Sequence, residues 1–357
     1  MYAKIAMATF WGKSSMIQPK VIGLDLAKQV FQVHGVDGGG QAVVRRTLRR
    51  SEVIGYFRKL APCLIGMEAC GTAHYWGREL MALGHEVRLM PAGYVKPYVK
   101  RGKNDAVDAE AICEAVTRPT MRFIAVKSAE QQAILMLHRT RDLLVRQRTM
   151  LVNSLRGQLA EFGLVAPKGV WHIPELDALA EGADEDALPA PARECARLLL
   201  AQIEDLQGNI KAIEKEIVAR HKANELSQRL ATIPGVGTIT ATAMVATVVD
   251  AGFFKSGRHF AAWVGLVPQQ NGTGGRTVLG GISKKGEPYL RRLLVLGATA
   301  VVRYVRNKPE LAGWVNALLA RRPARVVTVA VANKLARIVW AIMHKGGTFR
   351  ERSYGIA

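Results

Sequence analysis

The sequence predicts an α/β domain at the N-terminal end of the chain, followed by a mostly helical remainder. Short runs rich in β-branched residues alternate with helical patterns in the first third of the chain, which is typical of an α/β domain. Beyond that third, apolar residues recur at helical spacing over long segments. The chain has 357 residues, enough for about two or three domains with real cores.

The chain is strongly basic, with a formal net charge of +21 at pH 7 and an isoelectric point near 10.2. Because phosphate relieves self-repulsion of this size, the composition favours nucleic acid as the partner. We find no run of transmembrane length and no Lys-rich amphipathic helix flanked by aromatics, so a membrane is not expected. The four cysteines are scattered and no secretory signal is present, which predicts a cytoplasmic protein without disulfides or a zinc site.

Residues 1–20 are expected to be an N-terminal extension. The first ordered segment after it is Val21–Val36. Its apolar residues alternate with small or polar ones, which predicts either two strands of a hairpin or one long bent strand. Asp25 lies in the middle of this run. A buried, unpaired carboxylate costs several kcal/mol, so Asp25 either faces a cation or a metal or sits solvated in a turn. The strand alone does not decide between these two readings.

Three further acids lie in or at the start of predicted secondary-structure elements. Glu68 ends a second short apolar run, Cys63–Gly71, and Asp105 and Asp108 share one face of a helix that opens near Lys103. Carboxylates gathered from two strand ends and a helix make an all-oxygen site suited to Mg²⁺ or Mn²⁺. For the helical pair the alternative is an ordinary first turn, in which acids complement the helix dipole.

One helix is predicted before the Glu68 run, at Ser51–Phe57. A second helix, Ala73–Leu83, and a strand, His85–Met90, are predicted after it. The following segment, Tyr94–Lys103, interleaves aromatic and basic side chains just before the acidic helix. That composition suits contacts with a phosphate backbone, although an ordinary solvated loop would look the same. The basic residues concerned are Lys96, Lys100, Arg101 and Lys103.

The middle of the chain predicts a helical arm. Ser128–Phe162 is a long basic amphipathic pattern, Gly163–Pro191 is an insert richer in proline and acids, and Arg193–Arg220 is a second amphipathic pattern. We expect the two long helices to pair as an antiparallel coiled coil. Such an arm suits assembly into a dimer or tetramer, and an intramolecular helical hairpin fits the pattern equally well.

The last part of the chain begins with two glycines in a short turn. Pro234-Gly235-Val236-Gly237 stands between two helical patterns and looks like a helix-hairpin-helix, in which Gly235 and Gly237 let backbone N–H groups grip a phosphate. A plain helix–helix turn is the alternative. A glycine-rich loop follows Pro268, and a closing helix is expected over Val326–His344.

The acid-bearing segments together resemble a known family. Gly23–Lys28, Gly66–Gly71 and Lys103–Ala109 are similar to the Asp-Glu-Asp-Asp motifs of insertion-sequence transposases of the IS110 and IS1111 group. The resemblance runs from about Val21 to about Gly347, which is most of the chain.

This resemblance implies an RNase H-like, RuvC-like domain over 21–127, an arm over 128–225, a mostly helical transposase domain over 226–347 and a tail, 348–357. It also implies that the protein acts on target and donor DNA, guided by a structured noncoding RNA. In the RuvC-like domain it implies a catalytic metal site formed by Asp25, Glu68, Asp105 and Asp108.

The family's C-terminal domain uses a serine nucleophile in its glycine-rich loop, and here the chain departs from the pattern. Gly272 or Thr273 occupies the serine position, depending on how the glycines are aligned. Thr273 keeps a hydroxyl and is the predicted nucleophile, with Ser283 as the second candidate. The cations expected to neutralise charge on the phosphate are Arg276, Lys284, Lys285, Arg291 and Arg292.

Three functions therefore remain open. The first is an RNA-guided recombinase, located in the cytoplasm with the nucleoid, that forms a covalent protein–DNA intermediate. The second is a metal-dependent DNA junction nuclease that uses water. The third, a non-catalytic RNA- or DNA-binding protein, is disfavoured because clustered acids repel phosphate unless a cation intervenes.

Overall fold

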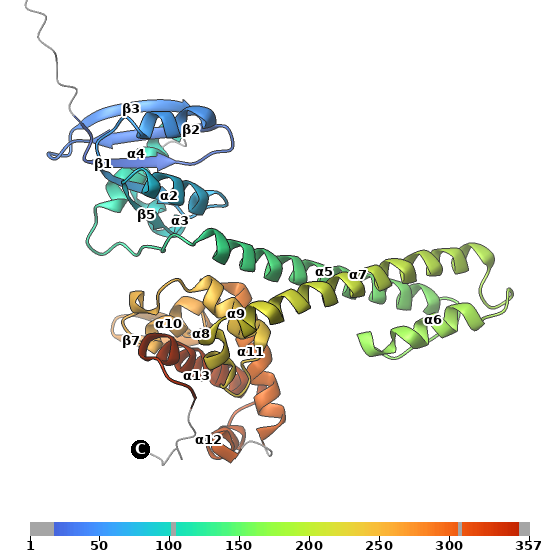
Figure 1. Cartoon of the computed structure of the whole chain (residues 1–357). Coiled ribbons are helices and arrows are strands. Elements are labelled where there is room, and N and C mark those ends of the chain that lie inside the picture. Colours follow the sequence, from blue (N-terminus) through green and yellow to red (C-terminus); the bar gives the residue numbers. More distant parts are fainter. Residues whose placement is uncertain (1–17, 101–104, 306–308, 350–357) are drawn as a thin grey trace, which may run out of the picture. The chain divides into compact units, whose positions relative to one another are not determined.

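The computed structural model describes residues 18–100, 105–305 and 309–349 (Figure 1). The chain divides into two compact units, residues 1–129 and 130–357, and each is described by itself. Most of the predicted N-terminal extension and tail lies outside the described residues, as do the predicted phosphate ligands Arg101 and Lys103.

A five-stranded sheet forms the centre of the first unit. Its strands are β1 (Val21–Asp25), β2 (Val30–Val36), β3 (Ala42–Arg49), β4 (Leu64–Glu68) and β5 (Glu86–Met90), in the order β3-β2-β1-β4-β5. β1 pairs antiparallel with β2 and parallel with β4. Of the two readings for Val21–Val36, the hairpin is confirmed and the single bent strand is wrong. This mixed α/β sheet is consistent with the expected RNase H-like domain.

Helices cover both faces of the sheet. α1 (Val53–Phe57) and α2 (Ala73–Ala82) bury Phe57 and Trp76 against Ile22 and Leu24 on one face. α4 (Asp105–Val116) packs on the opposite face, where its apolar residues form a separate cluster with Val21 and Leu64. Two short elements, α3 (Ala92–Val95) and the 3₁₀ turn η2 (Lys96–Tyr98), precede α4, and the 3₁₀ turn η1 (Arg50–Glu52) precedes α1.

Gly23 sets how closely α4 approaches the sheet. A Cβ at this position would lie 2.1 Å from the carbonyl oxygen of Ala109 and 2.4 Å from the amide nitrogen of Cys113. Both atoms belong to the α4 backbone, so no side-chain movement would relieve the clash. A residue without a Cβ is therefore required in β1 where α4 crosses it.

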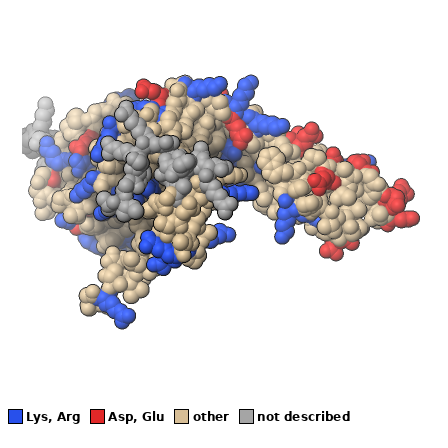
Figure 2. Space-filling model, turned by 90° about the horizontal axis from the view of Figure 1, so that it is seen from below, with Lys and Arg blue, Asp and Glu red and all other residues tan. Residues whose placement is uncertain are grey.

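The second unit begins with the predicted arm. α5 (Ala129–Ala160) and α7 (Ala190–Lys222) run antiparallel, with an ion pair between Arg141 and Glu214 at 2.6 Å. The insert between them carries the 3₁₀ turn η3 (Val170–His172) and α6 (Ile173–Gly182), which buries Leu176 between the two long helices. The helical hairpin is therefore intramolecular. Acidic side chains gather at the end of the arm that carries α6 (Figure 2).

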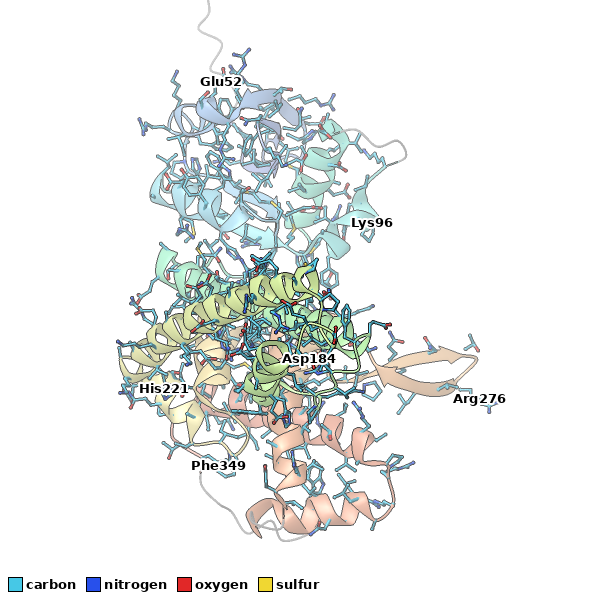
Figure 3. The ribbon with its side chains drawn as sticks, turned by 90° about the vertical axis from the view of Figure 1, so that its right-hand side faces the viewer. Glu52, Lys96, Asp184, His221, Arg276 and Phe349 are labelled. Carbon is cyan, nitrogen blue, oxygen red and sulfur yellow. The ribbon has the colours of Figure 1, made fainter. Side chains whose placement is uncertain are left out.

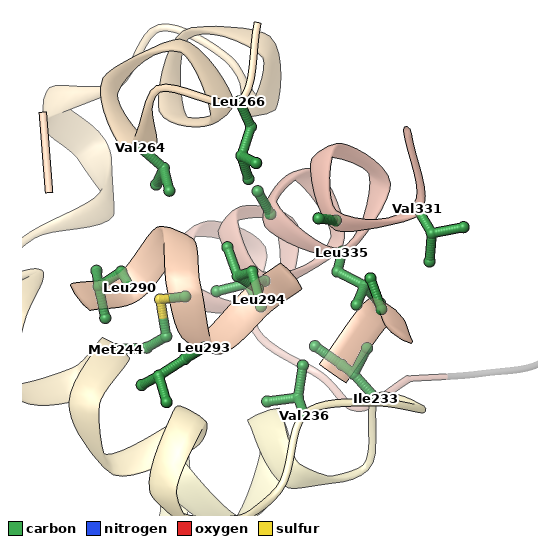
Figure 4. Packing of buried hydrophobic residues seen from close by; sticks show 14 of the residues in the cluster. Ile233, Val236, Met244, Val264, Leu266, Leu290, Leu293, Leu294, Val331 and Leu335 are labelled. Carbon is green, nitrogen blue, oxygen red and sulfur yellow. The ribbon is translucent and has the colours of Figure 1, made fainter. Parts of the chain in front are cut away.

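The rest of the second unit is a helical domain around one core. Its helices are α8 (Glu225–Ala231), α9 (Thr238–Thr247), α10 (Gly257–Val264), α11 (Pro288–Arg303), α12 (Pro309–Leu319) and α13 (Ala324–Lys345). A 3₁₀ turn, η4 (Ala251–Phe253), lies between α9 and α10. The core packs Met244 of α9 and Leu290 and Leu294 of α11 against Leu335 of α13 (Figure 4).

The helix α13 differs from the expectation that no run of the sequence reaches transmembrane length. α13 is long and apolar enough to cross a membrane, so the statement that no run reaches transmembrane length is wrong for this segment. Its residues Val331, Leu335 and Val339 are nevertheless buried in the core of the helical domain. The apolar residues of α13 supply its packing against α10 and α11.

The start of α5 is tied to the same domain. The ring of His138 is fully buried and lies 3.1 Å from the hydroxyl of Tyr289 in α11 and 3.1 Å from that of Thr242 in α9. Burial lowers the pKa of His138 to about 4, with a smaller contribution from Arg141. The neutral imidazole therefore joins the arm to the helical domain at neutral pH.

Candidate active site

The predicted acids come together in the first unit because of where its elements end. Asp25 is the last residue of β1 and Glu68 the last of β4, and these strands are parallel neighbours. α4 begins at Asp105, and Asp108 lies one turn further on the same face. One carboxylate oxygen from each of Asp25, Asp105 and Asp108 lies within 4.8 Å of the others.

The electrostatics of these carboxyl groups show how closely they interact. Burial raises the pKa of Asp25 to about 6, and the negative charges of Asp108 and Asp105 add to the effect. Burial also raises the pKa of Glu68, followed by the charges of Asp25 and Asp108. Glu68 lies outside the 4.8 Å group but within electrostatic reach of two of its members. We call these four residues the acid cluster.

The acid cluster fits a divalent metal. Its donors are carboxylate oxygens, which Mg²⁺ and Mn²⁺ prefer over nitrogen or sulfur. Half-buried carboxylates that repel each other are stabilised when a cation is bound between them. A metal held there would supply Lewis-acid stabilisation of the charge on a phosphoryl oxygen.

The described part of the basic segment, residues 94–100, is more structured than an ordinary solvated loop. Lys96 lies in η2, and the ammonium group of Lys100 donates to a carboxylate oxygen of Glu110 in α4 at 2.6 Å. This hydrogen bond raises the pKa of Lys100 and lowers that of Glu110. In this structure Lys100 therefore anchors the segment to α4.

The two glycines of the predicted helix-hairpin-helix occupy different environments. Gly235 has a φ of +85°, and a Cβ there would lie 2.8 Å from the carbonyl oxygen of Gly297 in α11. This close contact is a packing reason for Gly235. Gly237 is exposed at the start of α9, and a Cβ there would meet no atom within 4 Å. Gly237 therefore has no such packing role, and the phosphate contacts predicted for both glycines stay predictions.

The segment expected to be a glycine-rich loop is instead a β-hairpin, so that prediction is wrong. β6 (Pro268–Thr273) pairs with β7 (Arg276–Ile282), and Thr273 at the end of β6 faces Arg276 across the turn. Gly274 and Gly275 form that turn with φ values of 57° and 80°. A two-residue turn with both φ values positive suits the twist of a hairpin. The hairpin projects from the helical domain with Arg276 near its end (Figure 3).

The predicted cations of this region fall into two groups. Arg291 donates to the carbonyl oxygens of Val264 at 2.8 Å and Lys285 at 3.0 Å, and Arg292 pairs with Asp142. These two guanidinium groups therefore already have partners within the protein, and the assignment of all five cations to a phosphate stays a prediction. The exposed cations are Arg276 on the hairpin and Lys284 and Lys285 just after it.

Sequence reasoning missed a polar row beside the acid cluster. Asp25 pairs with Gln32 across β1 and β2, and Gln32 pairs with Thr47 across β2 and β3. The Thr47 hydroxyl donates to Oε1 of Gln32 at 2.9 Å. Strand alternation could have placed Gln32 on the face of Asp25, but only once the hairpin register was known.

Acids at the ends of two parallel strands, completed by a helix, form a site of the kind with which metal-dependent enzymes act on phosphodiesters. Comparison with known families gives the particular group. Residues 22–163 match a model for DEDD transposases of the IS110 type, described as "Transposase", and residues 227–312 match one described as "Transposase IS116/IS110/IS902 family". The chain belongs to this family and is a DNA transposase.

Individual relatives agree over nearly the whole chain. A Pseudomonas aeruginosa protein named "Probable family 20 transposase" is 52% identical over 331 residues, 92% of this chain and 98% of the relative. The transposase of element IS1328 from Yersinia enterocolitica is 40% identical, covering 92% of this chain and 98% of the relative. The transposase of element IS1111A from Coxiella burnetii is 39% identical, covering 95% and 93%.

Proposed function

We propose that this transposase cuts and exchanges DNA strands with the acid cluster as its metal site and the hydroxyl of Thr273 as its nucleophile. The observation that carries the metal site is the gathering of Asp25, Asp105 and Asp108 within 4.8 Å, with Glu68 beside them. Mg²⁺ or Mn²⁺ is the metal that this all-oxygen set favours. The protein works in the cytoplasm, on DNA of the nucleoid.

The covalent step needs a hydroxyl at an accessible position. Thr273 is exposed at the end of β6, and two glycines without side chains follow it. Its Oγ1 attacks phosphorus, so that an Oγ1–P bond forms while the P–O bond to the leaving sugar breaks. The hydroxyl proton passes to solvent, and the leaving sugar oxygen takes up a proton. Attack by the sugar hydroxyl of a second strand reverses these changes and releases Thr273.

The exposed cations at the hairpin support this step. Arg276 lies opposite Thr273, and Lys284 and Lys285 follow β7. Positive side chains near the attacked phosphate stabilise the extra charge that develops on its oxygens. Lys96 at the first unit and the backbone at Gly237 are proposed to hold DNA or RNA backbone away from the reacting bond.

Target and donor DNA, a noncoding guide RNA and further copies of the chain are the proposed partners. The net charge of +21 supports the binding of a large amount of nucleic acid. Support for a dimer or tetramer comes from α5, where Met136, Leu143 and Met150 are 69%, 47% and 70% exposed at seven-residue spacing. A stripe with this repeat is typical of a helix that packs against another helix.

Trapping the covalent intermediate tests the proposal. A DNA substrate nicked beside the cutting site loses the leaving fragment and should leave a DNA adduct on the peptide that contains Thr273, identified by mass spectrometry. Thr273→Val, which removes the hydroxyl and keeps the branched shape, should form no adduct. An adduct on Ser283 instead would move the nucleophile to that residue and contradict the assignment.

The second candidate function is a junction nuclease that uses water. It is favoured by the absence of a serine at Gly272 and Thr273, because the acid cluster alone suffices for metal-dependent hydrolysis. Cutting of four-way DNA junctions without any adduct, and with full activity in Thr273→Val, would establish this function in place of recombination.

A further inference from the structure

A groove of about 310 Å³ lies beside the acid cluster, on the face of the sheet that α4 covers. Its floor comes from β2 and β3 and its wall from the first turns of α4. We call it the strand groove, and its lining includes Gln32, His34, Arg45, Thr47, Val107 and Glu110.

The strand groove and the acid cluster share elements of structure. Gln32 is the cross-strand partner of Asp25, so their side chains leave the sheet on the same face. Ala106 and Val107, which line the groove, lie between Asp105 and Asp108 in the first turn of α4. A nucleic-acid strand whose phosphate is held at the acid cluster through a divalent cation would therefore place its neighbouring unit in the groove.

The chemistry of the lining suits one nucleotide of a strand. Thr47 donates to Oε1 of Gln32, which leaves the Nε2 hydrogens of Gln32 and the lone pairs of the Thr47 hydroxyl for a ligand. Arg45 is exposed, and within the described ranges of the chain it forms no ion pair. Glu110 is bound by Lys100, so its negative charge is balanced before any ligand arrives.

We propose that the strand groove binds the DNA nucleotide that flanks the phosphate engaged by the acid cluster. Arg45 contacts the phosphate of that nucleotide, and the Gln32–Thr47 pair contacts its sugar. The inference rests on the proposed function, because it takes the acid cluster to be the place where a DNA phosphate is held. It adds three positioning residues that set which bond of the strand lies at the metal site.

The test measures binding apart from cutting. Fluorescence anisotropy of the full chain with a labelled DNA strand, in Ca²⁺ in place of Mg²⁺, gives the affinity and its dependence on salt. Arg45→Ala should weaken binding about fivefold to tenfold and lower the slope of log affinity against log salt by about 0.7, the value for one phosphate contact on a single strand. Thr47→Val should weaken binding less and leave the slope unchanged, because it removes an uncharged contact.

Arg58→Ala is the matched control. Arg58 is exposed at the end of α1, on the opposite face of the sheet, so its removal changes the net charge equally without touching the groove. Equal effects of Arg45→Ala and Arg58→Ala on the affinity and the slope would overturn the inference. An effect of Arg45→Ala on an RNA strand of the same sequence but not on DNA would overturn it too, and would assign the groove to RNA.

A second measurement separates this inference from the proposed function. If the wild-type protein, supplied with the noncoding RNA and with Mg²⁺ or Mn²⁺, fails to cut DNA while Arg45→Ala still lowers the salt slope, the proposed function fails and the strand groove stands. If the wild-type protein cuts DNA at one bond, Thr47→Val should spread the cuts over neighbouring bonds. Cutting by Thr47→Val at the single wild-type bond, at the wild-type rate, would contradict the positioning role.

Discussion

Replacing Asp25 by asparagine should stabilise the metal-free protein, although it removes a residue of the proposed metal site. The carboxyl group has a pKa of about 6 in the folded chain against an ordinary value of 3.8. The folded protein therefore binds the Asp25 proton more tightly than the unfolded chain does. At pH 7 the ionised group destabilises the fold by up to about 3 kcal/mol, since a tenfold change in proton affinity corresponds to about 1.4 kcal/mol. Asp25→Asn has nearly the same shape and removes this charge.

The sign of the pH dependence follows from the same values. The destabilisation is complete above pH 6 and vanishes below about pH 4, where both states are protonated. In EDTA at pH 7 we expect Asp25→Asn to unfold at a higher temperature than the wild type, with the difference shrinking toward pH 4. With Mg²⁺ or Mn²⁺ the order should reverse, because the wild type gains more from the metal.

Thermal unfolding of the full chain, together with hydrogen exchange of peptides that cover β1 and β4, measures this effect in the first unit. Glu79→Gln in α2 is the control, since it removes a carboxylate on the other face of the sheet. Faster exchange and a lower unfolding temperature of Asp25→Asn in EDTA would show that Asp25 stabilises the metal-free fold. That result would refute the reasoning from burial and mutual repulsion.

Three further predictions concern packing, binding and the rate of the covalent step. Gly23→Ala should lower the free energy of unfolding by about 3 kcal/mol or more and weaken metal binding, because its Cβ would force the α4 backbone away from β1. Gly55→Ala is the control and should cost little, because a Cβ at Gly55 would meet no atom within 4 Å. The logarithm of the affinity for DNA should fall linearly with log salt, and an affinity that does not depend on salt would exclude phosphate as the main contact. Thr273→Ser should form the adduct roughly threefold to tenfold faster, measured by trapping over time, because a serine hydroxyl rotates freely and lacks the methyl group that crowds the attack.

The sequence predicted the first unit well because its signals are local. Strand alternation around Asp25, the acid at the end of the run to Glu68 and the spacing of Asp105 and Asp108 each require only neighbouring residues. The strand ends then converge because β1 and β4 are parallel neighbours. What the sequence did not contain was the register of the hairpin, and for that reason Gln32 and Thr47 were missed.

The second unit was harder to predict because its glycines and arginines serve contacts that are distant in sequence. Gly235 is needed against Gly297 of α11, yet its sequence signal is the same as that of a phosphate-binding turn. Arg292 pairs with Asp142, a residue of the arm, and no local pattern reveals a partner so far away. The hairpin was read as a loop because Gly272, Gly274 and Gly275 are poor strand formers. Its pairing is fixed by the tight turn at the last two.

The strand pairing also explains why threonine is compatible with the position proposed for the nucleophile. Thr273 ends β6 and faces Arg276, so its backbone is extended and a β-branched side chain fits. The branch restricts χ1, which holds the hydroxyl in few directions, whereas a serine there would sample more. The chain thus keeps the hydroxyl that the proposed covalent step needs and adds a methyl group that stabilises the strand end. The same methyl group reduces the directions from which a phosphate can approach, so we expect it to raise the stability of the hairpin and to lower the rate of the proposed attack.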